Sequence, residues 1–252
     1  MTFDPFAPGD LSSEEVFDRA MSALSGVRTA TVLGAAMPHK NADWLFPNDE
    51  IIVEHKQIET DFSRSDSFRE REVELRRNYI RSRRANILGV PYDSKAFDLD
   101  YIRLYQKSFA KILGKANVQI RETRNKLNWP KGRGILILSN KSLFKLTPLA
   151  ICMLVQGILE GAYSEIGGAA YVPNHYVDIP GSNLANLAWF PIYKHGGKDT
   201  SHDFIRFVDS FGERFLNHFR NSASDIHPVE QHRADSDEAF RIMRAKAIVP
   251  RS

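Results

Sequence analysis

The residues most suited to chemistry are Glu54 and Lys56, in the strand-like segment EIIVEHK over residues 50–56. Side chains alternate along a strand, so Glu54 and Lys56 leave the same face, while His55 leaves the other. A carboxylate and an ammonium group are therefore expected side by side on one face of a sheet.

A second carboxylate, Asp43, precedes this pair by eleven positions, at the start of another strand-like segment over residues 42–46. Residues 47–49, Pro-Asn-Asp, are typical of a turn. If Asn48 and Asp49 form a two-residue hairpin loop, Asp43 falls opposite Glu54. Two facing carboxylates repel each other, and a divalent cation between them would turn that cost into a binding site.

Asp43, Glu54 and Lys56, within NADWLFPNDEIIVEHKQ, resemble the motif of the PD-(D/E)XK nuclease superfamily. The resemblance implies that Asp43 and Glu54 hold a metal ion, and that Lys56 positions and activates a water molecule. One departure is Ala42, where the family name leads one to expect proline. A second acid-x-lysine triplet, Asp93-Ser94-Lys95, lies in a loop context without an apolar strand around it.

Carboxylates are hard oxygen ligands, so the expected cofactor is Mg²⁺ or Mn²⁺. The backbone carbonyl of His55 could serve as a further ligand, with its side chain in or near the core. The resemblance also implies an acid from the first helix, for which Glu14, Glu15 and Asp18 are the alternatives. Glu14 is our choice, because it flanks the apolar stripe of that helix. We expect Glu54 and Lys56 to be partly exposed.

The chain of 252 residues is 42% hydrophobic, enough for a sizeable core. We expect an irregular arm over 1–10, a single nuclease-like domain over 11–220 with a helical insertion at about 62–131, and a polar tail over 221–252. Residues 1–10 do not have the pattern of a signal peptide. A single cysteine, Cys152, excludes a disulfide framework, and the longest apolar run is too short to span a bilayer. These features predict a cytoplasmic protein without membrane contact.

Charge is distributed unevenly along the chain. Residues 63–131 carry 17 Lys and Arg against 8 Asp and Glu, whereas the remainder has 17 against 23. A basic segment on an acidic body indicates a polyanion partner. The expected nucleic-acid-binding residues are an arginine cluster and a stripe with a repeat of four: Arg76, Arg77, Arg81, Arg83 and Arg84, then Arg103, Lys107, Lys111 and Lys115.

The elements expected along the chain run helix, three strands, helices, strand, helix, strand. The first helix is predicted over 11–24, a short strand over 29–33, and a long helix from about 98 to 128. A fully buried strand is predicted over 135–138, and Thr147 with Pro148 predicts the start of a helix that runs to about Leu159. This order predicts an α/β fold with a mixed sheet, and it matches the restriction-endonuclease-like αβββαβ core that the resemblance implies, with a large basic helical insertion.

The leading functional hypothesis is a metal-dependent nuclease that hydrolyses phosphodiester bonds, in DNA rather than RNA, in a bacterial defence or restriction setting by family analogy. The alternative is a non-catalytic nucleic-acid-binding or regulatory subunit. A third hypothesis is a protein-interaction module. The chain has no phosphate-binding loop of its own, so a helicase or ATPase is a plausible partner. A homo-oligomer also remains open.

Overall fold

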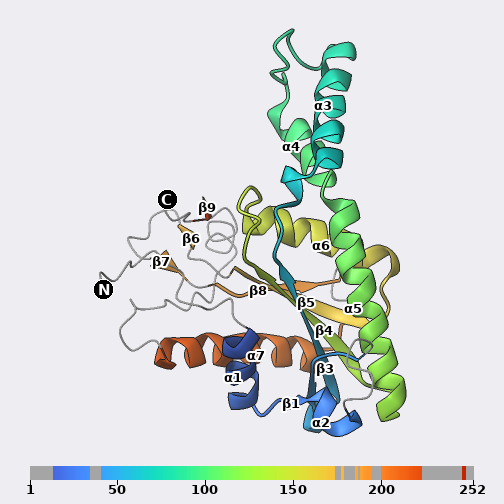
Figure 1. Cartoon of the computed structure of the whole chain (residues 1–252), viewed down its shortest axis with the longest axis vertical. Helices are drawn as coiled ribbons and strands as arrows, with labels where there is room; N and C mark the ends of the chain where they lie inside the picture. The colour runs from blue at the N-terminus through green and yellow to red at the C-terminus, as the bar shows by residue number, and fades with distance from the viewer. Residues whose placement is uncertain are drawn as a thin grey trace.

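A mixed β-sheet with helices on both faces forms the centre of the protein (Figure 1). The architecture comes from a computed structural model, which describes residues 14–34, 41–173, 177–178, 185–186, 188–194, 200–222 and 246–247. The predicted α/β class with a mixed sheet is confirmed. None of the described helices is long and apolar enough to cross a membrane.

The central sheet has six strands in the order β1-β2-β3-β4-β5-β8. β4 runs parallel to both of its neighbours, β3 and β5, and the remaining neighbouring strands are antiparallel. The bounds are β1 Val27–Arg28, β2 Trp44–Phe46, β3 Ile51–Ile58, β4 Arg133–Asn140, β5 Ile166–Pro173 and β8 Phe190–Tyr193. A small separate sheet joins β6 Val177–Asp178 to β7 Ala185–Asn186 and β9 Lys246–Ala247.

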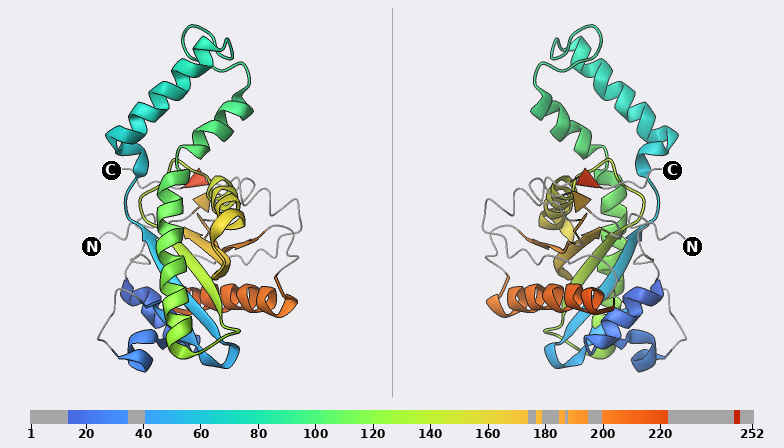
Figure 2. Two further views of the ribbon diagram at one scale, coloured as in Figure 1. Left: turned by 90° about the vertical axis from the view of Figure 1, so that its right-hand side faces the viewer. Right: turned by 90° about the vertical axis from the view of Figure 1, so that its left-hand side faces the viewer.

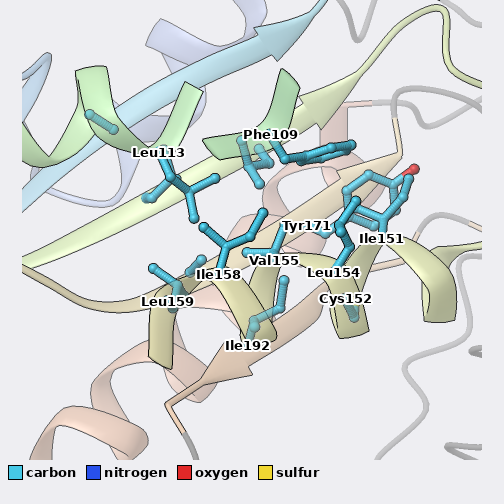
Figure 3. Close-up of a cluster of buried hydrophobic side chains, with 14 of the residues drawn as sticks. Phe109, Leu113, Ile151, Cys152, Leu154, Val155, Ile158, Leu159, Tyr171 and Ile192 are labelled. Carbon is cyan, nitrogen blue, oxygen red and sulfur yellow. The ribbon is translucent and has the colours of Figure 1, made fainter. Parts of the chain in front are cut away.

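One face of the sheet is covered by α5, Gln106–Leu127, and α6, Pro148–Ala162. Their apolar stripes pack on alternate residues of β3, β4 and β5, as Figure 3 shows for Phe109, Leu113, Val155 and Tyr171. α6 begins where the sequence predicts, because the hydroxyl of Thr147 accepts a hydrogen bond from the backbone N–H of Ala150. α5 lies within the basic segment of residues 63–131, yet it packs into the main core and is not part of a separate insertion.

The other face of the sheet is covered by α1, Glu14–Ala23, and α7, His202–Ser222. Both are amphipathic, and their buried residues include Phe17, Met21, Phe211 and Phe215. Since β3 and β4 lie between these two helical layers, both faces of each strand are buried. This explains the continuous apolar run over residues 135–138.

Two helices project beyond the sheet as an arm, which we define as residues 66–103 (Figures 1 and 2). α3, Asp66–Arg81, leads away from the body and α4, Ser94–Arg103, returns to it. A short 3-10 turn, Phe62–Arg64, joins β3 to the arm. The arm has its own small core of Tyr79, Ala85 and Phe97.

Residues 29–33 form a short helix, α2, and the predicted strand there is wrong. The β-branched sequence TATVL favours a strand only weakly, because that preference depends on a pairing partner. The Thr29 N–H still bonds the Asp43 carbonyl, next to the β1–β2 pairs, and β2 itself extends no further than Trp44. Without further strand to pair with, the chain turns into a helix.

The single helix predicted from 98 to 128 is also wrong, because α4 ends at Arg103 and α5 begins at Gln106. Arg71 of α3 donates a hydrogen bond to the Leu104 carbonyl at the break. The Tyr105 N–H bonds the carbonyl three residues earlier, at Ile102, in place of the α-helical partner. The break lets the arm and the core helix point in different directions.

Gly134 of β4 allows α5 to pack closely on the sheet. A Cβ at this position would lie 2.5 Å from the Glu165 carbonyl oxygen and 2.5 Å from Ile120 Cγ2. We expect Gly134→Ala to lower the free energy of unfolding by about 1–3 kcal/mol through overpacking. The matched control is Gly157→Ala in α6, where nothing lies within 4 Å and alanine should stabilise by up to about 1 kcal/mol. Urea unfolding of both variants measures the difference, and equal stability would contradict this packing.

Candidate metal centre

The pairing of β2 with β3 places the two carboxylates as the sequence predicts. Trp44 pairs with Val53 and Leu45 with Ile52, so continuing the register by one residue sets Asp43 opposite Glu54. The connection differs from the expected two-residue loop. Residues 47–49 form a 3-10 turn, and Glu50 adopts a left-handed conformation with φ of 49°. The turn nevertheless preserves the predicted register.

Glu54 and Lys56 leave the sheet on the face covered by α5 and α6, the face to which Ile52 also contributes. Their side chains form an ion pair. The Glu54 side chain is 0% exposed and that of Lys56 is 27% exposed. The expectation of partial exposure is therefore correct for Lys56 and wrong for Glu54, because α5 crosses this part of β3 and covers it.

Burial and a neighbouring charge dominate the electrostatics of Glu54. Burial, and after it the negative charge of Asp43, raises its pKa from 4.5 to about 8, against the opposing effect of the Lys56 ammonium. Glu54 Oε1 is paired with the Lys56 ammonium, whereas Oε2 makes no hydrogen bond of ordinary geometry with the described residues. A buried carboxylate with open acceptor positions, close to a second carboxylate, has the donor set that Mg²⁺ or Mn²⁺ prefers.

Asp43 is held from two directions. Its Oδ2 accepts a hydrogen bond of 2.9 Å from the backbone N–H of His55 on β3. The residues just before it are fixed by α5, because the Ala42 N–H donates to the Thr123 hydroxyl at 2.7 Å and Gln119 donates to the Asn41 carbonyl at 3.1 Å. The carboxylate is thus positioned by the strand and the helix together.

The α5 side chains that support Asp43 were not identified from the sequence. Thr123 and Gln119 are joined by Lys126, whose ammonium donates to Asn41 Oδ1 at 2.6 Å. A signal was available, since Thr123 continues the stripe of Ala116 and Ile120, and a polar residue on an apolar stripe requires a buried hydrogen-bond partner.

Ala42 has a physical role at the position where the family name has proline. Its N–H makes the hydrogen bond to Thr123, and both residues are buried. Proline has no N–H and would leave the Thr123 hydroxyl without this donor. The Thr123 hydroxyl therefore requires a residue with a backbone N–H at position 42.

The His55 side chain faces the α1 and α7 layer, as predicted. Its ring stacks on Phe17 at a centroid distance of 3.9 Å and its Nε2 lies 2.7 Å from the Ser139 hydroxyl. Burial lowers its pKa to about 3, so the imidazole is neutral at physiological pH. The side chain is structural, and only its backbone lies near the carboxylate pair.

Other predicted ligands are placed less directly. Glu14 begins α1, but its side chain and that of Glu15 lie outside the described residues. Asp18 forms an ion pair with Arg28. Within the described ranges, no three His, Cys, Asp or Glu side chains gather into a metal-binding group. Asp93, of the second acid-x-lysine triplet, caps α4 by accepting a hydrogen bond from Ala96.

The predicted arginine cluster lies on the arm, but it is not free of acidic partners. Arg76 pairs with Glu72 at 2.9 Å and Arg81 approaches Glu74 at 3.5 Å. Such pairs form because residues four or seven apart lie on the same side of a helix, and they are weak at the surface. The other three arginines have no ion pair among the described residues: Arg77, Arg83 and Arg84.

The predicted basic stripe is divided by the helix break. Lys107, Lys111 and Lys115 are exposed along one side of α5, away from the sheet. Arg103 ends α4 and pairs with Asp100 at 2.8 Å. The three lysines thus form a continuous exposed row from the base of the arm along α5, and Arg103 lies at the end of the preceding helix.

Comparison with known proteins adds no assignment. The chain matches no protein-family model, no curated protein and no solved structure.

The raised pKa of Glu54 predicts a stability effect in the metal-free protein. A carboxyl with a folded-state pKa of about 8 stabilises fully below its unfolded value near 4.5 and loses that contribution as pH rises towards 8. In chelator, Glu54→Gln should therefore be more stable than the wild type by an amount that grows from pH 5 to 8, on the order of 1–3 kcal/mol. Thermal unfolding at several pH values measures it.

A matched control is Glu59→Gln, one position beyond β3, where the side chain is exposed. Its stability difference from the wild type should not change across the same pH range. A Glu54→Gln variant that is less stable than the wild type at pH 8 would show that the buried carboxylate is ionised and well paired without metal.

Proposed function

We propose that this chain is a metal-dependent nuclease that hydrolyses phosphodiester bonds in DNA. The observation that carries the proposal is the juxtaposition of Asp43 and Glu54 across the β2–β3 pair, with the Lys56 ammonium on the same face. The order α1, β1, β2, β3, α5, β4 supports a restriction-endonuclease-like core, with α2 and the arm as additions.

The residues of the site fit a divalent cation held by Asp43 and Glu54, with the His55 carbonyl as an additional candidate ligand. Such an ion would polarise a phosphoryl oxygen and lower the pKa of a bound water. The Lys56 ammonium lies beside Glu54. There it would orient a water molecule and offset the negative charge that develops on phosphorus. α5 would keep Asp43 in place through Thr123.

The basic surfaces support a nucleic-acid substrate. Lys107, Lys111 and Lys115 lie exposed on α5, the helix that also supports Asp43. Arginine and lysine side chains bind phosphates and release counterions, which supplies sequence-independent affinity. A duplex bound along this row would be held by the same helix that positions the site.

A second candidate, a non-catalytic nucleic-acid-binding subunit, is favoured by one observation. Glu54 is completely buried, and its raised pKa favours the neutral carboxyl over the ion pair with Lys56 when no cation is bound. A neutral, buried Glu54 is stable without a metal ion, as a protein that binds nucleic acid but does not cleave it would require. The two candidates differ in whether divalent cations change the site, which the following experiment decides.

Glu54→Gln and Lys56→Ala should each abolish Mg²⁺- or Mn²⁺-dependent cleavage while leaving DNA binding within about threefold of the wild type. Gln keeps the size of Glu54 but removes the charge that a cation requires, and Ala removes the ammonium beside it. Cleavage of plasmid and linear DNA, with and without chelator, measures the loss. A helicase or ATPase partner would be added where the chain alone is inactive.

The controls are Glu59→Gln and Lys141→Ala, which change the same residue types at exposed positions beyond the ends of β3 and β4. Both should retain cleavage. Chelator-sensitive cleavage that survives Glu54→Gln and Lys56→Ala would place the metal site elsewhere. DNA binding with no cleavage under any of these conditions would favour the non-catalytic subunit.

Arg77, Arg83 and Arg84 have no ion pair among the described residues, and changing all three to Gln should weaken DNA binding across sequences. It should also lower the dependence of log K on log salt concentration by roughly 0.9 for each phosphate that the variant no longer binds. The matched control changes three exposed arginines elsewhere, Arg121, Arg206 and Arg214. A triple Gln variant of the arm with an unchanged salt slope would mean that these arginines do not touch phosphate.

A further inference from the structure

The arm exposes an unusual concentration of apolar side chains. Of the ten large apolar residues exposed in the described part of the chain, seven lie between Val73 and Leu99. The most exposed are two neighbours at the very end of the arm, Ile87 at 88% and Leu88 at 84%. Single exposed apolar residues are common, but a cluster of this kind indicates a contact surface.

The loop that carries these residues has a defined structure. The Asn86 N–H bonds the Val90 carbonyl, and Asn86 Oδ1 accepts hydrogen bonds from the N–H groups of Leu88 and Val90. Gly89, with φ of 77°, completes the turn, a conformation that glycine adopts without strain. These bonds fix the loop backbone, and the fixed loop leaves the Ile87 and Leu88 side chains in solvent.

The base of the loop is anchored to the arm. The Arg84 N–H bonds the Tyr79 carbonyl, and the Tyr92 N–H bonds the Arg84 carbonyl. Tyr79 packs edge-on against Phe97 of α4 and donates a hydrogen bond to Asp100 at 2.8 Å. Since α3 is about 24 Å long, the loop is held well away from the sheet.

Charge surrounds the apolar end of the arm. Residues 76–95 contain six Lys and Arg against one acid, Asp93, which caps α4. The half of α3 nearer the sheet, residues 66–75, is acidic, with four Asp and Glu against two Arg. The positive charge is therefore concentrated at the end that carries the exposed apolar pair.

We propose that the loop is a DNA wedge, in which Ile87 and Leu88 insert between neighbouring base pairs of a duplex while Arg83 and Arg84 bind the flanking phosphates. Aliphatic wedges beside arginines unstack base steps and bend duplexes in this way. The inference deepens the proposed nuclease function, on which it rests for its substrate class, by naming bent double-stranded DNA as the form that is bound.

Charge complementarity favours duplex DNA over a second copy of this chain, a partner protein or a membrane as the molecule that binds the loop. A phosphate backbone offers negative charge on both sides of an apolar base stack, which matches an apolar pair flanked by arginines. A second copy of this chain would have to bring an acidic surface to arginines that here face solvent. A partner protein with an acid-rimmed apolar pocket, or an anionic membrane, is an outcome of the test.

The test measures DNA binding and unstacking by the full chain in chelator, so that cleavage does not enter. The probe is a short duplex with 2-aminopurine at a central thymine–adenine step, which is easily unstacked. The wild type should raise the fluorescence of the base analogue. Ile87→Ser with Leu88→Ser should abolish that rise and weaken binding by about tenfold, because serine buries far less apolar surface between the bases.

The matched control is Val118→Ser with Met153→Ser, two exposed apolar residues on α5 and α6. It should leave both signals unchanged. Fluorescence and affinity that are unaltered by the loop variant, or no duplex binding by the wild type, would overturn the wedge. If the loop variant kept its binding to DNA but lost binding to anionic vesicles or to an acidic protein, the wedge would be overturned in favour of that partner.

These outcomes separate the wedge from the proposed nuclease activity. Unstacking by the wild type, abolished in the loop variant, without any metal-dependent cleavage would retain the wedge and reject the nuclease. Metal-dependent cleavage with no effect of the loop variant on binding or unstacking would retain the nuclease and reject the wedge.

Discussion

The antiparallel pairing of β2 with β3 is the constraint on which the candidate site depends. Its register sets Asp43 opposite Glu54, and the alternation of β3 sets Lys56 on the same face. A shift by one residue would move the β3 side chains to the opposite layer, where His55 stacks on Phe17. The hydrophobic residues on both sides of β3 resist such a shift, so the core fixes the geometry of the polar site.

α5 connects the core, the site and the basic surface. Its buried stripe packs on β3 and β4, Thr123 and Gln119 hold the chain just before Asp43, and its outer side carries the lysine row. The same packing closes off Glu54 and raises its pKa. Burial therefore makes the carboxylate costly to ionise, and it leaves Glu54 Oε2 without a hydrogen-bond partner among the described residues.

The arm has its own small core, separate from the two cores that cover the sheet. The helix break at Leu104, stabilised by Arg71, redirects the chain from α4 into the core helix. A small aromatic core then makes the arm stiff enough to hold a hydrogen-bonded loop in the solvent. Within the described part of the chain Ile87 and Leu88 stay almost fully exposed, which is why binding to another molecule accounts for them best.

The sequence alone determined what depends on local periodicity. The α/β class, the two faces of β3, the buried run in β4, the cap of α6 at Thr147 and the register of Asp43 with Glu54 follow from alternation, turn residues and apolar spacing. Tertiary structure decided the rest. The helix at 29–33 reflects the end of the paired β2 strand, and the break near Leu104 reflects a bond from Arg71. The complete burial of Glu54 reflects a helix more than fifty residues later in the chain, and contacts over such separations leave no local pattern to read.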